Sequence, residues 1–561
     1  MRIALLIALA SALAAQRAEA CGCFTPPNPT VPVVQAGERI LFAVKDGQVT
    51  AHIQVQFSGG DADFGWLLPL PSVPTLELGN DELFARLLTA TQPRYQMSVV
   101  RDSSCQFGFA TGGGATGGGA ASGGGAGGGS QDAGSGPPVL VVESSVGPYD
   151  YAVLHADSKT DMLDWLAANR YFVPTGTDDA VTPYIHEGGY FLALKLRPGK
   201  STGDLQPVVL RYQSDFGVIP ITLTATGAQE NMGVQVWMLG DGRAIPRNYH
   251  HTLINDAAID WVRGGANYND VIIRAVGEAP GRHTFVTEYS GSGSAVKNLL
   301  LPANRFGVQS DFSAAPTPDD FIALLWAKGF QGPTPLNPYG ASSLPSTVKA
   351  ILAAYIPPPQ DVNLDTFYAN YAFYKATAPA PNYQPQQMAQ ELWERVVTPS
   401  INAAQLFETH STLTRLYSTI SPADMNRDPA FSFNPSLPPV SNLHQATMRI
   451  TCPTQFSQVG LLTTEQGWNM EYPNGQFGAP LVSLDTLPAS LRVEVAHEEG
   501  PSDVIIDNLV KQASTQTVSP RLFQAMLEAP TPMTMMRSCS VTGAQLGLAA
   551  LAVFVLRRRR R

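Results

Sequence analysis

The sequence predicts an α+β fold, with mainly antiparallel, sandwich-like β structure, peripheral helices and a more helical second half. Apolar and polar residues alternate with a period of two at several places in the first half, which is typical of antiparallel strands with one wet face. Segments with helical spacing lie between them and become more frequent toward the C-terminus. Gly and Pro account for 50 and 45 of the 561 residues and only 15% are charged, which excludes a coiled coil, a bundle of long helices and a highly charged disordered chain.

Strands are expected where the alternation is clearest. From residue 49 to residue 57, apolar residues alternate with Thr, His and Gln, which predicts a half-buried strand. The same period occurs at 192–196, 208–212, 221–225 and 234–238. Four tryptophans lie within apolar patterns and are expected to fill the core rather than to stack on sugars: Trp66, Trp165, Trp237 and Trp261.

Helices are expected where a cap precedes helical spacing. Asn80 is a good N-cap for a helix that begins at Asp81 and presents apolar residues on one face. Ser158 and Asp161 have the spacing of a capping box before a second helix. In the second half, helices are expected at 317–329, 345–355, 386–396 and 402–419, separated by proline-rich joints.

A glycine-rich segment interrupts the first half of the chain. Residues 112–136 contain 14 glycines, and such a segment buries too little apolar surface to offset the entropy lost on ordering. We expect a flexible loop inserted into the fold. Gly199–Thr202 imitates the end of a P-loop, but Leu194 stands where that motif needs its first glycine, so no cofactor is expected.

The N-terminus has the features of a secretory signal peptide. Arg2 precedes an apolar run from Ile3 to Ala15, and Ala18-Glu19-Ala20 fits a cleavage site. The run is too short to span a membrane. Cleavage would make Cys21 the first residue, although Ala18 and Glu19 depart from a lipoprotein signal.

The C-terminus has the features of a membrane segment with a charged end. An uncharged stretch from Val541 to Leu556 follows Cys539. As a helix it would be about 24 Å long, somewhat short for a bilayer core of about 30 Å. The cluster that follows would stay on the cytoplasmic side and consists of Arg557, Arg558, Arg559, Arg560 and Arg561. This tail resembles the C-terminal sorting signal of myxobacterial surface proteins, which is processed near its Cys; a permanent tail anchor is the alternative.

The two ends conceal part of the negative charge of the chain. The formal net charge is −10; residues 1–20 contribute +1 and the terminal arginines +5, so the remainder carries −16. An acidic protein of this kind is not expected to bind nucleic acid or an anionic lipid surface.

The cysteines predict disulfides rather than a metal or redox site. If Cys539 belongs to the sorting signal, Cys21, Cys23, Cys105 and Cys452 can form two disulfides in an oxidising compartment. Cys21 and Cys23 are too close in sequence to bond comfortably, so we expect them to pair outward with Cys105 and Cys452. A metal site of the usual kind would need a second closely spaced pair.

Several segments together resemble an uncharacterised bacterial family, domain of unknown function 2330. The resemblance includes Cys-Gly-Cys-Phe at 21–24 and Phe-Gly-Trp-Leu-Leu-Pro-Leu-Pro at 64–71. Further segments are 146–151, 164–171, 205–212, 219–221 and 414–431, which extend the similarity to about residue 445. The resemblance implies an exported envelope protein and supplies no catalytic residues.

The candidate metal ligands each have a simpler explanation. His186-Glu187 and His497-Glu498 begin like a zinc-protease helix, but neither has a second His at the required position. Asp424 to Asp428 has the oxygen spacing that opens a calcium loop, but Pro429 stands where the loop needs Gly. Six residues remain as candidate ligands, and a cleft that brought three of them together would favour an enzyme. They are His155, His186, His250, His251, Asp256 and His283.

The chain is therefore expected to divide into a signal peptide at 1–20, an exported body at 21–445, a C-terminal extension of that body at 446–537, and the tail at 538–561. The function expected is that of a non-enzymatic binding or structural module at the cell envelope or surface, anchored at least transiently in the membrane and handled by export and sorting machinery. An exported hydrolase, with or without a metal ion, is the alternative.

Overall fold

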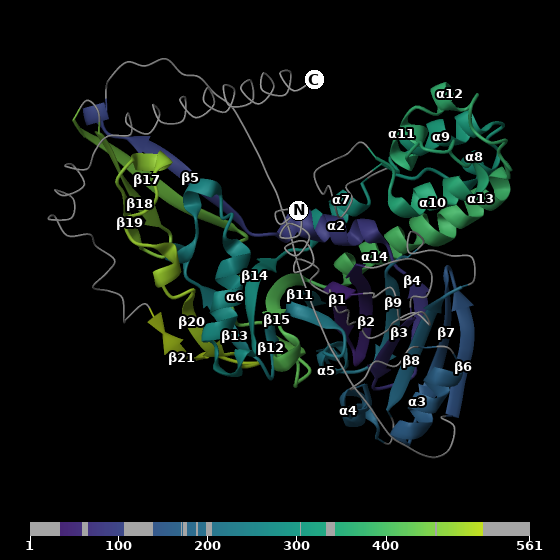
Figure 1. The fold of residues 1–561 in the computed structure, drawn as a ribbon, viewed down its shortest axis with the longest axis horizontal. Helices are drawn as coiled ribbons and strands as arrows, with labels where there is room; N and C mark the ends of the chain where they lie inside the picture. The colour runs from purple at the N-terminus through teal and green to yellow at the C-terminus, as the bar shows by residue number, and fades with distance from the viewer. Residues whose placement is uncertain are drawn as a thin grey trace, which may run out of the picture.

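The structure, a computed structural model, describes residues 34–58, 65–105, 139–169, 171, 177–186, 189–197, 205–302, 305–331, 343–454 and 457–508. In these residues the chain forms four β-sheets and a group of helices (Figure 1). The prediction of an α+β fold is confirmed. Most helices of the second half lie between residues 294 and 409, and further strands follow them.

A large mixed sheet runs through the molecule. Its strands, in spatial order, are β21 (Asp503–Asp507), β20 (Ser490–Val495), β13 (His250–Ile254), β14 (Thr284–Gly291), β15 (Thr412–Ile420), β11 (Ala228–Gly240), β1 (Val34–Lys45), β2 (Gln48–Ser58), β9 (Val208–Gln213) and β4 (Thr75–Leu78). The predicted strands at 49–57, 208–212 and 234–238 are confirmed as β2, β9 and β11.

The centre of this sheet departs from the expected pattern of one wet face. β1 and β11 pair in parallel, with Ile40 beside Val236. Every residue of β11 from Val234 to Gly240 is buried, because both faces are covered. Parallel pairs are usually buried on both faces, which gives a continuous apolar run rather than strict alternation.

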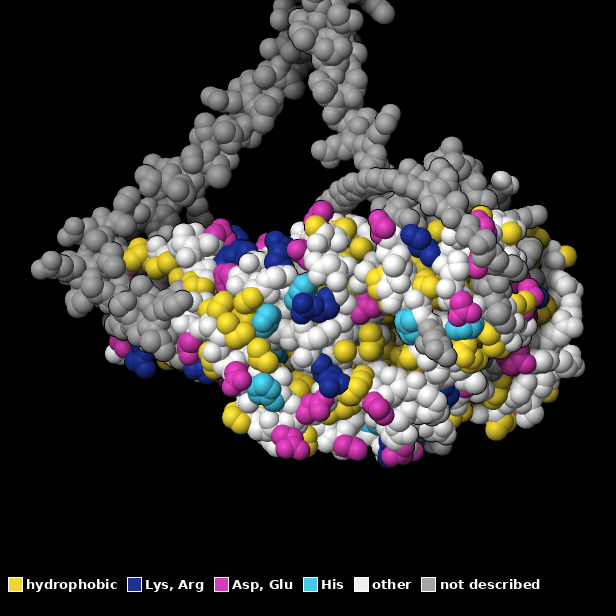
Figure 2. All heavy atoms as spheres, turned by 90° about the horizontal axis from the view of Figure 1, so that it is seen from below, with side chains coloured by type: hydrophobic (Ala, Val, Ile, Leu, Met, Phe, Trp, Pro, Cys, Tyr) yellow, Lys and Arg dark blue, Asp and Glu magenta, His cyan; other side chains and the backbone are white. Residues whose placement is uncertain are grey.

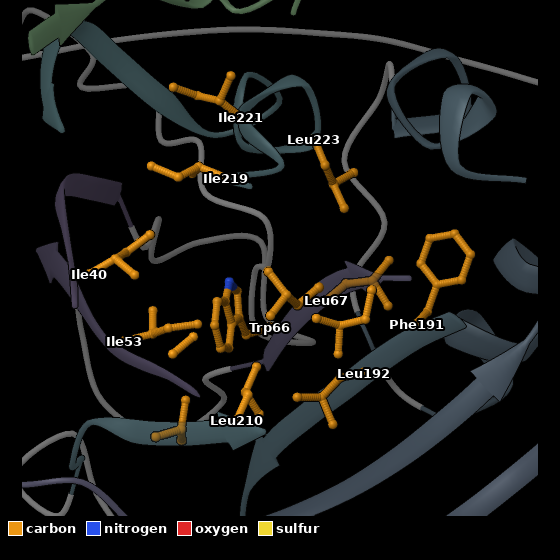
Figure 3. Close-up of a cluster of buried hydrophobic side chains, with 14 of the residues drawn as sticks. Ile40, Ile53, Trp66, Leu67, Phe191, Leu192, Leu210, Ile219, Ile221 and Leu223 are labelled. Carbon is orange, nitrogen blue, oxygen red and sulfur yellow. The ribbon is translucent and has the colours of Figure 1, made fainter. Parts of the chain in front are cut away.

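A second sheet packs on one face of β1, β2 and β9. Its strands are antiparallel, in the order β3 (Gly65–Leu70), β8 (Tyr190–Leu196), β7 (Tyr149–His155) and β6 (Val139–Val146). The predicted strand at 192–196 is thus confirmed as β8. Between the two sheets lies an apolar core in which Trp66 is surrounded by Ile53, Leu67 and Leu210 (Figure 3).

Three helices cover the opposite face of the large sheet. They are α2 (Asp81–Thr91), α7 (Ser294–Leu300) and α14 (Thr398–Thr409). Their apolar side chains pack against Leu41 of β1 and against Trp237, which is fully buried. As predicted, Asn80 caps α2, accepting a hydrogen bond of 2.8 Å from the backbone N–H of Glu82.

A third sheet and helix α6 (Tyr268–Glu278) form another core at the β13 end. The strands are β19 (Asn469–Tyr472), β18 (Ser457–Thr464), β17 (Leu443–Thr454) and β5 (Arg94–Arg101). Trp261 is buried in this core. Since β5 pairs with β17 in parallel, the predicted C-terminal extension joins the sequence near residue 100 in one sheet. The core role predicted for tryptophan is confirmed for Trp66, Trp237 and Trp261, whereas Trp165 is partly buried.

The remaining elements are short or form a helical subdomain. The short elements are α3 (Lys159–Ala168), α4 (Thr177–Val181), α5 (Ile221–Thr224) and a small sheet of β10 (Gly217–Val218), β16 (Ala430–Asn434) and β12 (Arg243–Pro246). The helical subdomain, at the upper right of Figure 1, contains α8 (Gln309–Ser313), α9 (Pro318–Ala327), α10 (Ser346–Tyr355), α11 (Leu364–Ala369), α12 (Tyr371–Tyr374) and α13 (Pro385–Leu392). It has its own apolar core.

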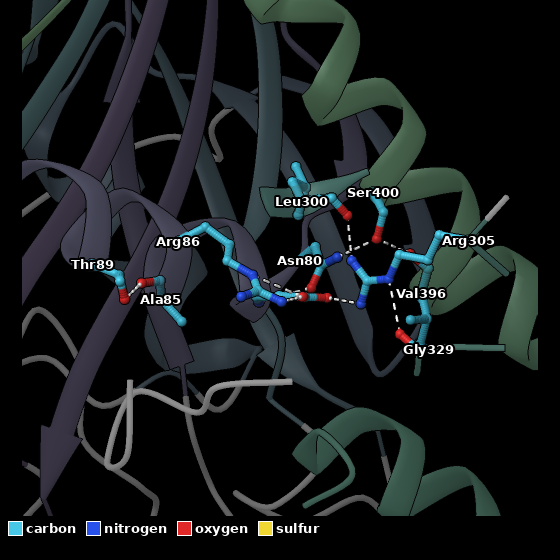
Figure 4. Close-up of polar contacts among 10 residues, drawn as sticks. Asn80, Ala85, Arg86, Thr89, Leu300, Arg305, Gly329, Val396 and Ser400 are labelled. Atoms are coloured by element: carbon cyan, nitrogen blue, oxygen red, sulfur yellow. Dashed lines mark hydrogen bonds and ion pairs between the residues drawn. The ribbon is translucent and has the colours of Figure 1, made fainter. Parts of the chain in front are cut away.

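Buried polar contacts join the helical subdomain to α2. Arg305 donates to Oε2 of Glu82 at 2.6 Å, while Arg86 donates to Oε1 at 2.7 Å (Figure 4). Asn80 donates to the hydroxyl of Ser400 in α14, which in turn donates to the backbone carbonyl of Val396 just before that helix. These contacts fix the helical subdomain to the helices that cover the large sheet.

Two predicted elements have a different structure. The expected strand at 221–225 is the single helical turn α5, because Asp428 accepts hydrogen bonds from both the backbone and the hydroxyl of Thr222. The expected helix at 402–419 ends at Thr409, and the rest is strand β15. This strand lies between β11 and β14, so sheet pairing determines its conformation.

The predicted capping box before α3 is also wrong. Helix α3 does begin after Ser158, but the Ser158 side chain makes no capping hydrogen bond. Oδ1 of Asp161 is buried and has no hydrogen-bond partner among the described residues. The helix is held instead by Met162 and Leu166, which are buried in the core between the sheets.

The predicted disulfide pairing is corrected by the structure. Cys105 and Cys452 bond to each other, 347 residues apart in sequence. The parallel pairing of β5 with β17 brings the ends of these strands together, since Arg101 lies beside Ile450. Because Cys105 and Cys452 bond to each other, the expectation that Cys21 and Cys23 pair with them is wrong. Cys21 and Cys23 themselves lie outside the described residues.

Several predicted segments lie outside the described residues. They are the signal peptide at 1–20, the glycine-rich segment at 112–136, the turn at 199–202 and the tail at 538–561. In the part of the chain that the structure describes, no helix has both the length and the apolar character needed to cross a bilayer.

Candidate functional site

A cavity of about 220 Å³ lies between the large sheet and the β3–β8 pair. Its lining is largely aliphatic and aromatic and comes from β1, β2, β3, β8, β9 and β10, together with the turns at Tyr184 and Asp428. Concave apolar sites with few polar groups are typical of small-molecule binding. A dry cavity of similar size is large enough for benzene.

The floor of the cavity is built by strand alternation. Glu38, Ile40 and Phe42 share one face of β1 because successive side chains of a strand point to opposite faces. All three are at most 3% exposed. Ile53 of β2 and Leu210 of β9 continue this surface on the neighbouring strands.

One side of the cavity reaches the surface of the molecule. Pro71, His186 and Val218 line it and are exposed. Phe216 lies beside them, and the guanidinium of Arg247 stacks over its ring at 3.7 Å. The site therefore has a buried floor and an accessible rim.

Glu38 is the unusual residue of the floor. Its Oε2 is buried without a hydrogen-bond partner among the described residues. Burial raises the pKa of the Glu38 carboxyl from 4.5 to about 7, because an apolar environment disfavours the charged form. Near neutral pH this carboxyl can either donate or accept a hydrogen bond.

Asp428 has its carboxylate oxygens occupied by protein donors. Oδ2 accepts a hydrogen bond of 2.7 Å from Tyr184, and Oδ1 accepts from the backbone and hydroxyl of Thr222 at 2.9 and 2.8 Å. Burial raises the pKa of Asp428 above its ordinary value, although these hydrogen bonds oppose the rise. Burial and the neighbouring Asp428 raise the pKa of Tyr184 as well. This cluster holds the rim together.

A comparison with known protein families identifies the family of the chain. Residues 15–296, half of the sequence, match the bacterial family described as "Uncharacterized protein conserved in bacteria (DUF2330)". The chain belongs to this family. The DUF2330 match includes all of the cavity lining except Asp428. It ends before the similarity at 414–431, so the extension to about residue 445 stays a prediction. No curated protein and no solved structure matches the chain.

The histidines considered as metal ligands are held separately. His155 donates to the carbonyl of Gly189 at 2.7 Å, and His186 lies at the cavity rim. On the face shown in Figure 2, histidine side chains are spread out rather than gathered in one hollow. Among the described residues, no group of three His, Cys, Asp or Glu side chains could hold a metal ion.

The other candidates lie near β13 and β14 and have different partners. His250 and His283 are neighbours, but His250 Nδ1 donates to the carbonyl of His283, while His283 Nε2 donates to the carbonyl of Asp424. His251 contacts Glu494 at 3.5 Å. Asp256 lies 3.5 Å from His444.

The two carboxylates of the calcium-like segment are also separated. Asp424 pairs with Arg282 at 2.9 Å, whereas Asp428 turns toward Tyr184 and Thr222. His497 pairs with Asp503. Asp424, Asp428 and His497 therefore each have a partner within the protein.

Sequence reasoning missed the residues that distinguish the DUF2330 cavity. Glu38 and Tyr184 come from distant parts of the chain and carry no motif, and Asp428 was considered only as part of a calcium-like segment. One signal was present in the sequence: Glu38 is in phase with Ile40 and Phe42, so an acidic residue occupies an inward position of a strand.

Proposed function

We propose that this DUF2330 protein is an exported envelope or surface protein that binds a small apolar ligand, without catalysis, in the cavity between its two sheets. The observation that carries the proposal is the cavity itself, with its apolar floor and exposed rim. At about 220 Å³ it is large enough for a molecule of the size of benzene or for one end of a longer chain.

The polar groups of the lining support binding rather than catalysis. Tyr184 and Asp428 are bonded to each other, and the hydroxyl of Ser214 donates to the backbone carbonyl of Phe216 at 3.0 Å. A nucleophile needs a base within hydrogen-bond reach, and the hydroxyl of Ser214 is directed to its own turn instead.

The proposal of export rests on the two ends of the sequence. Residues 1–20 have the pattern of a signal peptide, and residues 538–561 combine a Cys, an apolar stretch and an arginine cluster. The Cys105–Cys452 disulfide is consistent with an oxidising compartment. In this proposal the tail contacts the membrane and is handled by sorting machinery.

Substitution of Val218 by tryptophan is expected to weaken binding of toluene at least tenfold. Val218 is 39% exposed at the rim, so the larger side chain can be accommodated while it obstructs the entrance. Saturation-transfer NMR titration measures the dissociation constant. Val504→Trp is the control, because Val504 is also an exposed strand valine, 48% exposed, and does not line the cavity. Equal toluene binding by the two variants would reject this site.

Mass spectrometry of protein recovered from the cell envelope is expected to find Cys21 as the first residue, because the signal peptide predicts cleavage after Ala20. Without reduction, the digest should contain peptides linked through Cys105 and Cys452. A mature chain that begins at Met1 and has both thiols free would contradict the proposal of export. Detection of Arg561 would separately remove the model in which the tail is cut near Cys539.

A further inference from the structure

The floor of the cavity contains one unsatisfied polar group. In the described part of the chain, Oε2 of Glu38 is the buried polar atom of the lining that has no hydrogen-bond partner. Its carboxyl lies on the face that also carries Ile40 and Phe42, and β11 places the buried Val234 beside Glu38. These neighbours contribute no side-chain donor. A buried acceptor of this kind needs a donor from elsewhere.

The charges around the cavity restrict what can supply that donor. The described lining contains two carboxyl groups, Glu38 and Asp428, and no Lys or Arg side chain. Asp428 is already bonded to Tyr184 and Thr222. An anionic ligand would bring its charge into an apolar lining in which, among the described residues, no cationic side chain compensates it. A ligand with a hydrogen-bond donor would meet an acceptor that lacks one.

We infer that the ligand of this cavity is a small apolar molecule with a hydrogen-bond donor group, an amine or a hydroxyl, which binds the carboxyl of Glu38. The inference rests on the proposed function, since it assigns the chemistry of the ligand in the same cavity. The apolar body of the ligand packs against Ile53 and Leu210, and its donor group reaches the carboxyl of Glu38. A ligand that ends in a carboxylate is disfavoured.

Four probes that share one ring separate these chemistries. Toluene supplies the apolar body alone, benzyl alcohol adds a neutral donor, benzylamine adds a cationic donor, and benzoate adds an anion. We expect benzyl alcohol or benzylamine to bind wild-type protein about tenfold more tightly than toluene, and benzoate to bind more weakly than toluene. Which donor probe binds best then distinguishes a neutral from a cationic ligand.

Two substitutions of Glu38 make the test specific. Glu38→Leu removes the acceptor, so the ratio of the toluene and benzyl alcohol dissociation constants is expected to fall to about one. Glu38→Gln keeps an acceptor oxygen in a side chain of similar size but removes the ability to carry a negative charge. This variant is expected still to bind benzyl alcohol more tightly than toluene. Any tighter binding of benzylamine that depends on the charge of Glu38 should be lost. The Gln variant keeps the test valid if the Leu variant does not fold.

The outcomes separate this inference from the proposed function. If toluene binds and Val218→Trp weakens it, but the donor probes show no preference, the cavity is a binding site and the inference about Glu38 is wrong. A preference that persists in Glu38→Leu, or benzoate that binds as tightly as benzyl alcohol, also overturns it. If none of the four probes binds, the proposed function itself fails.

Discussion

Substitution of Arg305 by methionine is expected to lower the free energy of unfolding by about 3 kcal/mol. The side chains of Arg305 and Glu82 are 4% and 2% exposed, and their ion pair measures 2.6 Å. Arg305 also donates to the backbone carbonyls of Leu300 and Gly329. Its removal leaves buried acceptors without a donor, which costs more than the ion pair itself contributes. The expected effect is at the lower end for a broken buried pair, because Arg86 still contacts Glu82.

Urea denaturation followed by circular dichroism measures this effect as a shift of the transition midpoint. Lys297→Met is the matched control, since it also removes a cation at the α7–α14 contact. Lys297 and Glu408 are 34% and 55% exposed, so the loss there is expected to stay below about 1 kcal/mol. Equal shifts for the two variants would show that the buried contacts of Arg305 with Glu82 do not fix the helical subdomain to α2.

Substitution of Glu38 by glutamine is expected to remove a strong dependence of stability on pH. Burial raises the pKa of Glu38 from 4.5 to about 7, so the native state retains a proton that the unfolded chain has released. Stability from this group is fully present below about pH 4.5 and is lost as pH rises through about 7. Relative to Glu38→Gln, the wild type should lose about 3 kcal/mol between pH 4 and pH 8.

Denaturation curves of both proteins across this pH range give the difference directly, because titrations common to both cancel. Glu230→Gln is the control. Glu230 is exposed in β11, so its difference from the wild type should change little with pH. A flat difference for Glu38→Gln, or a wild type that gains stability relative to it as pH rises, would mean that the Glu38 carboxyl is not buried in an apolar cavity.

Elements governed by local rules could be predicted from the sequence. Helix α2 has its N-cap at Asn80, where the short polar side chain satisfies a free backbone N–H. Strand β2 follows the alternation of residues 49–57. In both cases the residues that determine the conformation lie within a few positions of one another.

Elements governed by distant contacts could not be predicted. Most of residues 412–420 were expected to continue the helix predicted at 402–419. Pairing with β11 on one side and β14 on the other makes them a strand. Residues 221–224 alternate like a strand, yet Asp428, more than 200 residues away, holds Thr222 in a turn. The cavity has the same origin, because Glu38 and Tyr184 are distant in sequence and line one cavity only in the folded chain.

The covalent link between Cys105 and Cys452 turns most of the chain into a closed ring. The ring contains all of the helical subdomain, β11, β15 and the glycine-rich segment at 112–136, which begins seven residues after Cys105. A single backbone cut anywhere in this ring opens it without releasing a fragment. In the proposed exported protein, a molecule nicked once by a protease within this ring would stay one covalent unit, because the disulfide beside the β5–β17 pair joins its two pieces.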